Sequence, residues 1–447
     1  MAVNHFPKEI NIEDRKRAID RRKVQEIKSS QRKNKSLLLF WLLIGPGVLV
    51  MLGENDAPSM LSYAATGSTF GVGFFIPFVL LTFFMAYIVQ EMTLRIGATT
   101  HQGHAQLIFD RFGSFWGWFA IGDLLLGNFL TLVTEFIGVR AGLGFFNISA
   151  VFSVILALGL VVGVSLTQRY WTWERITLGL AVFNLVFVPV ALMTHPNLGQ
   201  TAHALLFWNP LPGGFSQKVL FLMMADIGAT VTPWMLYFHQ SAVADKGLTT
   251  EDIPAGRRDI AVGAILAAIG GIAAVIAAAP LFARHISAQN FAAAQFAQAL
   301  EPIIGRWGAA LFALGIFEAG LVAIITISSS SGYAFGEITA KPHSLNRPVK
   351  EAWPFYAIIF SSAVLAAVIV LTPNAPLEYI ALIVNVIATL AMPPALLFVL
   401  LLANDREIMK RSYNSVITNV IAIAIVVFIS LTGVVYGVLT VFPHLNF

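Results

Sequence analysis

The 447-residue sequence contains no cysteine and few charged residues. The absence of cysteine excludes a disulfide framework, thiolate metal ligands and a cysteine nucleophile. Charged residues make up 12% of the chain and hydrophobic residues 57%, whereas soluble domains carry roughly 25% charged residues. A single soluble core could not bury so much apolar surface, which indicates an all-α protein that crosses a membrane many times. The net charge of +4 comes from loops and an N-terminal arm, and we expect no nucleic-acid binding.

Motifs typical of hydrolytic enzymes are also missing. The chain has no H-E-x-x-H and no G-x-S-x-G segment, the patterns that carry zinc-protease and serine-hydrolase chemistry. Residues 1–36 contain eleven Lys and Arg residues, too many charges for the apolar core of a cleavable signal peptide. We therefore expect no enzyme, no cofactor and no cleaved leader, with 1–36 as a basic cytoplasmic arm or a short surface amphipathic helix.

Long apolar stretches follow this arm along the rest of the chain. About 20 apolar residues suffice to span a bilayer, and eleven candidates satisfy this requirement: 37–66, 72–94, 114–142, 150–167, 173–194, 215–244, 258–282, 305–336, 354–372, 376–403 and 415–442. With the N-terminus in the cytoplasm, 24 Lys and Arg residues fall on the cytoplasmic side and 4 outside, as the positive-inside rule requires. We predict eleven spans in the plasma (inner) membrane, with the C-terminus outside.

Two of these spans, the first and the sixth, are interrupted by proline and polar residues. The first break is 54–59 (Glu-Asn-Asp-Ala-Pro-Ser) and the second is 228–234 (Gly-Ala-Thr-Val-Thr-Pro-Trp). Proline removes a helix hydrogen bond, and broken backbone at membrane depth survives only inside the protein or beside a polar cavity. A carboxylate at such a break, here Asp56, marks an ion or substrate site.

The two breaks lie five spans apart, which indicates an internal repeat. Corresponding interrupted helices in two halves are the sequence sign of an inverted-repeat transporter with a site at the membrane midplane. We predict a LeuT-type arrangement in one transport domain, 37–447: a first repeat at 37–194, a second at 215–403, and one added helix at 415–442.

The residues around both breaks resemble the Nramp family of divalent-metal transporters. The segment 45–47 (Gly-Pro-Gly), followed by Asp56, is similar to the family's first helix, whose break reads Asp-Pro-Gly-Asn. The stretch 228–241 is similar to its sixth helix, which reads Met-Pro-His at the break, and 95–97, 135–138 and 404–409 extend the likeness over the chain beyond residue 37. The resemblance implies a carrier that works by alternating access around Asp56.

The departures from the family pattern concern the site itself. Ala57, Pro58 and Ser59 stand where the family has Pro, Gly and Asn, and Thr232 replaces the methionine. Soft thioether ligands favour transition metals, whereas oxygen donors suit Mg²⁺, which keeps several of its waters. The altered site resembles that of the Nramp-related magnesium transporters, so we expect Mg²⁺ to be favoured and Mn²⁺ also carried.

The expected donors are oxygen atoms from both breaks and from span ten. They are the Asp56 carboxylate, the Ser59 and Thr232 hydroxyls, and carbonyls freed near Ala57 and Ala229, while the small Ala57 leaves room for a hydrated ion. Asn385 stands where the family has a glutamine that approaches the metal, and we expect it to act through water. Because Asp56 could instead cap the second half of its helix, and Thr232 could bond only backbone, both alternatives stay open.

Proton coupling is not expected. Leu132 and Trp234 occupy positions where the resembled family has an acid and a histidine, and proton relays through membranes are chains of Asp, Glu and His. Glu135 remains, and we expect it to form a structural or gating pair with Arg140 rather than a relay.

Four other polar residues within the predicted spans cannot be given a single role from the sequence. Glu54 and Asn55 could face the same cavity or a neighbouring helix. Asp226 and Glu318 could lie on the ion path, or pair with Arg140, Lys218 or backbone.

Two histidines, His101 and His104, are spaced like metal ligands but fall in a short loop, which we expect to be solvated. Three rival functions also stay open: a proton-coupled Mn²⁺/Fe²⁺ symporter, the same fold with another substrate, and a channel.

Overall fold

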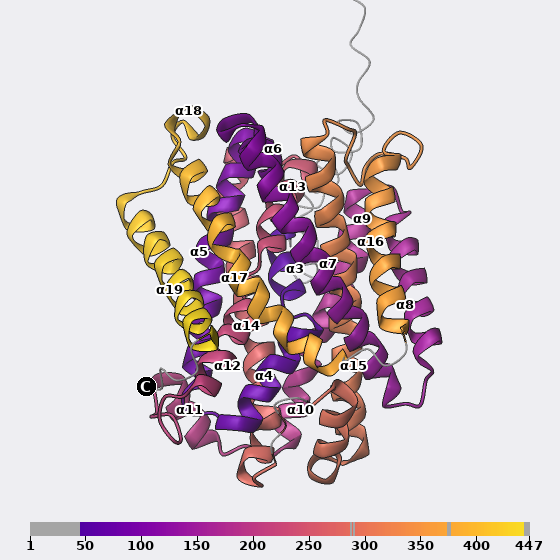
Figure 1. The fold of residues 1–447 in the computed structure, drawn as a ribbon, viewed down its shortest axis with the longest axis vertical. Helices are drawn as coiled ribbons and strands as arrows, with labels where there is room; N and C mark the ends of the chain where they lie inside the picture. The colour runs from indigo at the N-terminus through magenta and orange to yellow at the C-terminus, as the bar shows by residue number, and fades with distance from the viewer. Residues whose placement is uncertain (1–44, 287, 289–290, 373–376, 442–447) are drawn as a thin grey trace, which may run out of the picture.

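A computed structural model describes residues 45–286, 288, 291–372 and 377–441. The predicted arm 1–36 and the beginning of the first span, 37–44, lie outside the described residues. Within them every regular element is a helix (Figure 1). The helices are α3 Pro46–Gly53, α4 Ala57–Phe70, α5 Phe75–Thr100, α6 His104–Phe112, α7 Ser114–Gly144, α8 Ala150–Ser165, α9 Tyr170–Ala181, η2 Val182–Val186, α10 Phe187–Met193, α11 Leu198–Leu206, α12 Gln217–Gly228, α13 Pro233–Lys246, η3 Thr250–Asp252, α14 Ile253–Ala283, α15 Ala293–Ile338, α16 Trp353–Leu371, α17 Leu377–Asn404, α18 Arg406–Met409 and α19 Val416–Val441.

Each of the eleven predicted spans overlaps at least one of these helices. In the described part of the chain, nine helical stretches are long and apolar enough to cross a membrane: Phe75–Thr100, Ser114–Gly144, Tyr170–Met193, Gln217–Lys246, Thr250–Ala283, Ala293–Ile338, Trp353–Leu371, Ile383–Asn404 and Val416–Leu439. The two remaining predictions correspond to α8, which is apolar but shorter, and to α3 together with α4.

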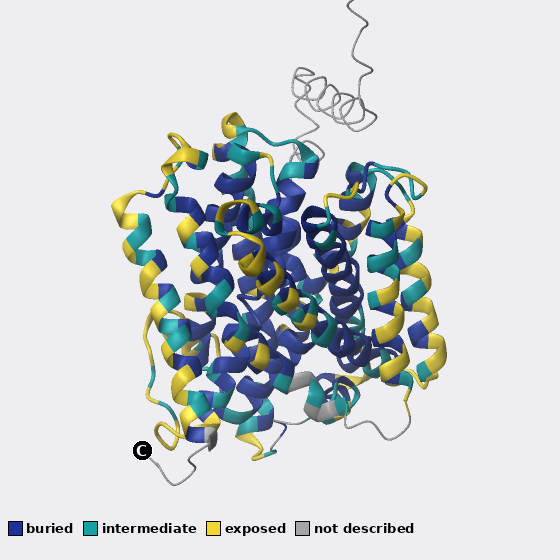
Figure 2. Cartoon of the chain, turned by 45° about the horizontal axis from the view of Figure 1, so that its top comes forward, coloured by how far each residue is buried: buried dark blue, intermediate teal, exposed yellow. Residues whose placement is uncertain are grey.

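Burial separates central helices from peripheral ones. In the most apolar window of Gln217–Lys246, 89% of residues are buried, against 22% in that of Val416–Leu439. Figure 2 shows the same contrast between the buried middle of the molecule and the exposed outer faces of α8, α16 and α19. Because the exposed residues on α8, α16 and α19 are largely apolar, these faces suit contact with lipid rather than water.

Proline determines where the second half of each interrupted helix begins. α3 ends at Gly53 and α4 begins at Ala57 with Pro58 in its first turn, while α12 ends at Gly228 and α13 begins at Pro233. In the first turn of a helix the N–H that proline lacks would have no partner anyway. The residues between the halves, 54–56 and 229–232, are therefore outside the regular helices.

Two long helices hold these half-helices in place. α14 packs along α3, α4 and α5, and α15 packs along α7, α4 and α13. The contact of α4 with α14 is so close that a Cβ added at Gly67 would overlap the carbonyl of Val275. Both breaks are consequently enclosed by neighbouring helices at the centre of the molecule.

Candidate cation site

Side-chain contacts join the two breaks. Thr232 Oγ1 donates a 2.7 Å hydrogen bond to Glu54 Oε1, and the Tyr63 hydroxyl donates to the Ala229 carbonyl at 3.1 Å. The predicted ligands (Asp56, Ala57, Ser59, Ala229, Thr232 and Asn385, here called the candidate site) are each at most 3% exposed. The candidate site is therefore closed to solvent in this structure.

Asp56 caps α4, which was one of the two roles open from sequence. Its Oδ1 accepts a 2.9 Å hydrogen bond from the amide of Ser59, the usual bond of an N-terminal cap. Capping does not exclude ion binding, because a carboxylate has about four lone-pair positions on its two oxygens. Capping instead fixes the carboxylate at the start of α4.

Three buried carboxyl groups are near enough here to affect one another electrostatically, although they do not converge on one point. Asp56 repels both Glu54 and Glu135, and Glu54 also repels Glu135. All three side chains are almost fully buried, and buried carboxylates of like charge need a proton or a cation beside them. A divalent cation would offset this repulsion.

Several polar atoms around the breaks lack hydrogen-bond partners among the described residues. They include Glu54 Oε2, Ser59 Oγ, Glu135 Oε1 and Asn385 Nδ2, and also Asn55 Oδ1 and Trp234 Nε1. Nearly all buried polar atoms in native proteins are hydrogen-bonded, to protein or to water. The unpartnered oxygens suit a cation, and the Asn385 amide suits one of its waters.

Ala57 and Ala229 have no polar side chain, so they and the main chain of Asn385 enter the site through backbone contacts. The Ala57 amide donates to Glu135 Oε2 at 3.1 Å, and its methyl group lies against Gly138. The Ala229 carbonyl already accepts from Tyr63, although a carbonyl has a second lone pair. The backbone carbonyl of Asn385 lies so close to Gly228 that a Cβ there would overlap it.

Glu54 and Asn55, left open from sequence, point to different neighbours. Glu54 faces the second break through Thr232. Asn55 faces neighbouring helices: its Nδ2 donates to Asn184 Oδ1 at 3.0 Å and to the Ala267 carbonyl at 2.8 Å, and Asn184 Nδ2 donates to the Asn55 carbonyl at 2.9 Å. Sequence reasoning missed Asn184, which lies in η2, a 3₁₀ interruption between α9 and α10.

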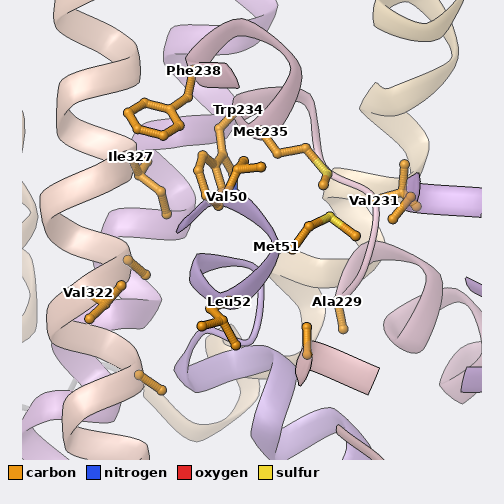
Figure 3. Close-up of a cluster of buried hydrophobic side chains, with 14 of the residues drawn as sticks. Val50, Met51, Leu52, Ala229, Val231, Trp234, Met235, Phe238, Val322 and Ile327 are labelled. Atoms are coloured by element: carbon orange, nitrogen blue, oxygen red, sulfur yellow. The ribbon is translucent and has the colours of Figure 1, made fainter. Parts of the chain in front are cut away.

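Sulfur is closer to the candidate site than the sequence analysis allowed. The amide of Thr232 donates to Met235 Sδ at 3.4 Å. Met235 and Trp234 belong to an apolar cluster with residues of α3 and α15 (Figure 3), in which the rings of Trp234 and Phe238 lie 6.1 Å apart. The Met235 thioether thus accepts a hydrogen bond from the backbone of Thr232. The apolar cluster lies beside the two breaks.

The expected Glu135–Arg140 pair is wrong. Glu135 accepts from the Ala57 amide, whereas Arg140 Nη1 donates to the Val370 carbonyl at 2.9 Å. Side chains five positions apart on a helix point in different directions, unlike those three or four apart. Glu135 thus belongs to the first break rather than to a gate with Arg140.

Asp226 and Glu318, whose roles were open from sequence, do not pair with Arg140 or Lys218 among the described residues. Asp226 accepts from the hydroxyls of Ser62 and Thr66, at 2.7 and 3.0 Å, and not from Arg140 or Lys218. Both carboxylate oxygens of Glu318 lack a partner within the described ranges.

The expectation of a solvated loop is wrong for His104. It begins α6, is fully buried, and lies 3.0 Å from Gln240 Oε1 through Nδ1. Burial lowers the pKa of its imidazole to about 4, and the contact with Gln240 opposes this shift. His101 stays exposed, so the two histidines do not converge on one point.

No three His, Asp or Glu side chains in the described part of the chain are arranged to hold a metal ion together. The candidate site instead combines carboxylates with hydroxyls, an amide and carbonyls from two breaks. Such a set suits an ion that keeps part of its water shell and leaves again, rather than a permanently bound metal.

An all-helical membrane protein with two interrupted spans that meet at buried carboxylates has the architecture of a LeuT-like secondary transporter. The sequence profile described as "Natural resistance-associated macrophage protein-like" (Nramp) matches residues 47–439, and the chain belongs to this family. The family consists of transporters and not of enzymes, as expected.

Individual relatives agree with this assignment. The chain is 23% identical over 410 residues to the "Divalent metal cation transporter MntH" of Aeromonas hydrophila (86% of this chain, 92% of the relative), and 24% identical over 400 residues to that of Latilactobacillus sakei (85% and 84%). Its fold matches a crystal structure of the Eremococcus coleocola manganese transporter with a TM-score of 0.72 at 18% identity, over 90% of this chain and 87% of that one.

Proposed function

We propose that this protein is a secondary carrier of divalent metal cations that favours Mg²⁺ and also carries Mn²⁺, by alternating access around Asp56. The observation that carries the proposal is the set of buried, unpartnered oxygens where the two breaks meet. Relatives named as divalent metal cation transporters, and a manganese transporter of the same fold, support the general class. The preference for Mg²⁺ rests on Thr232 in place of a thioether ligand.

Within this proposal Asp56 is the principal ligand, joined by Ser59, Thr232 and the carbonyls of Ala57 and Ala229. Asn385 acts through a water of the ion. To this set we add Glu54, because its Oε1 already meets Thr232 and its Oε2 lacks a partner among the described residues.

The proposed topology follows the sequence prediction. Eleven spans form two inverted repeats of five plus one added helix, in the plasma (inner) membrane, with the N-terminus in the cytoplasm and the C-terminus outside. The uneven distribution of Lys and Arg supports this orientation, and the equivalent interruptions after α3 and α12 support the repeat.

Asp56→Ala tests the site. Proteoliposomes carrying the variant should show no Mg²⁺ or Mn²⁺ uptake, while the purified protein still elutes as a single species. Glu351→Ala, a change at an exposed loop carboxylate, is the control and should transport like the wild type. Near-normal uptake by Asp56→Ala would contradict the proposal.

Thr232→Met tests the selectivity. Restoring a soft ligand should weaken Mg²⁺ uptake relative to Mn²⁺ and Cd²⁺, whereas Thr232→Ser should keep the wild-type order. A wild type that already prefers Cd²⁺ and ignores Mg²⁺ would refute the oxygen-donor argument.

We also propose that transport is not coupled to protons. A divalent ion entering at a membrane potential of 100 mV gains about 4.6 kcal/mol, twice the roughly 2.3 kcal/mol per unit charge. This drives accumulation without protons. Internal pH recorded during uptake should stay constant, and acidification that follows the cation gradient and survives leak controls would instead favour the proton-coupled rival.

A further inference from the structure

We propose that Asp226, with Ser62 and Thr66, forms a second cation-binding site between Asp56 and the outer end of α4. This inference rests on the proposed function, because it places the second site on the route of the transported divalent ion.

A row of hydroxyl groups runs along one face of α4. Ser59, Ser62, Thr66 and Thr69 follow one another at intervals of three, four and three residues, which places them on the same side of a helix. Ser62 Oγ donates to Asp226 Oδ1 at 2.7 Å and Thr66 Oγ1 to Oδ2 at 3.0 Å. The carboxylate of α12 thus meets the middle of this row.

The two ends of the row have unused hydrogen-bonding capacity. Ser59 Oγ, fully buried next to Asp56, and Thr69 Oγ1, near the end of α4, have no partner among the described residues. Unpartnered buried hydroxyls call for water or an ion beside them. The row therefore continues as a polar strip from the candidate site toward the end of α4.

Asp226 lacks a counter-charge in the described part of the chain. Its side chain is 0% exposed and meets two neutral hydroxyls, while no Lys or Arg of the described residues pairs with it. A buried carboxylate without a positive partner is strongly unfavourable. A cation would supply that partner, and both hydroxyls can rotate to turn a lone pair toward it.

The position of Ser62 and Thr66 on α4 places the second site between Asp56 and the outside of the membrane. Ser62 and Thr66 are six and ten residues beyond Asp56, which corresponds to about 9–15 Å at 1.5 Å per residue. Figure 1 shows α4 running from the centre of the molecule toward the end at which α11 lies, the outside in the proposed orientation. Carboxylate and hydroxyl oxygens select hard cations such as Mg²⁺ and Mn²⁺.

Mn²⁺ binding to the full-length protein tests this site directly. Electron paramagnetic resonance of free Mn²⁺ gives the number of bound ions: we expect two for the wild type, one for Asp56→Ala, one for Asp226→Asn, and none for the double variant. Glu351→Gln, which also neutralises a carboxylate but at an exposed loop position, is the control and should bind like the wild type. Asp226→Asn should also raise the KM of uptake while leaving the central site occupied.

Thr66→Val provides a second test that keeps the carboxylate if Asp226→Asn fails to fold. The variant removes one of the two hydroxyl oxygens that turn toward the ion, so Mn²⁺ binding at the second site should weaken about tenfold. Wild-type stoichiometry in Asp226→Asn, or unchanged affinity in Thr66→Val, overturns the second site while leaving the proposed function intact. A wild type that binds no Mn²⁺ overturns both.

Discussion

Gly138→Ala should disturb the candidate site without replacing any of its residues. Gly138 on α7 faces Ala57, the first residue of α4, and a Cβ added there would lie well under 3.0 Å from the Ala57 methyl group, closer than real Cβ atoms approach one another. An ordinary contact of at least 3.4 Å requires α7 and α4 to separate. Asp56 caps that end of α4 and would move with it.

Overpacking a dense interior typically costs about 1–3 kcal/mol. If this strain falls on the arrangement in which α4 and α7 are packed together, the population of that arrangement drops about 5- to 150-fold relative to others. We therefore expect divalent-cation uptake in proteoliposomes to fall by about tenfold or more at equal protein content.

A matched control and a rescue distinguish this mechanism from general damage. Gly122, on the same helix, has no atom within 4 Å of an added Cβ, so Gly122→Ala should transport normally. Adding Ala57→Gly to Gly138→Ala leaves only ordinary contacts of 3.6 Å, to the Cα of residue 57 and to Ile316, and should restore most of the uptake. Equal activity of Gly138→Ala and Gly122→Ala, or a double variant no better than Gly138→Ala alone, would refute the reasoning.

Three further changes test neighbouring parts of the structure. Asp259 accepts hydrogen bonds from the amides of Gly45 and Gly47 at the start of α3, at 2.7 and 2.8 Å, so Asp259→Ala should loosen the start of α3. Because the chain lacks cysteine, a single cysteine introduced as Val48→Cys can report this change, and it should react faster with a maleimide in the Asp259→Ala background. Asn184→Ala removes two hydrogen bonds of Asn55 and should lower thermal stability, because unpaired buried polar groups cost about 1–3 kcal/mol. The pKa of His104 is lowered from 6.5 to about 4. Between these two pH values the unfolded chain binds more protons than the folded protein, so the free energy of unfolding falls as pH decreases. His104→Gln should therefore make the thermal unfolding temperature depend less on pH in this window.

The features that could be predicted from sequence are those that depend on residues close together along the chain. Apolar runs located the helices because each run needs its own length to cross a bilayer. Proline together with polar residues located the two breaks, because Pro58 and Pro233 each remove a helix hydrogen bond and fit best in the first turn of a helix. The carboxylate at the first break points to Asp56 as a ligand for the same local reason, and this assignment stays a prediction.

Contacts between distant segments could not be predicted in this way. The bond from Thr232 to Glu54 joins residues 178 positions apart, and nothing around Glu54 reveals which helix it faces. Asn184 is a single amide within an apolar run and has no periodic pattern to mark it. His104 was misread because a short loop between spans suggests solvent, whereas here the loop folds into α6 and its first residue packs under Gln240.

The proposed alternating access requires the first span to move, and α14 makes the contacts that would have to change. α14 holds both ends of α3: Asp259 binds the amides at its start, and the Ala267 carbonyl accepts from Asn55 just beyond its end. The bond at the start involves only backbone amides of α3, which can exchange for water once exposed, whereas Asn55 is bonded at the same time to Asn184 on a third helix. The end of α3 next to Asn55 is therefore held more firmly than its start. In the proposed transport cycle, α3 should rotate about this end when the hydrogen bonds to Asp259 break. In the proposed mechanism such a motion would open the inner side of the break, while the Ser59 amide keeps Asp56 at the start of α4.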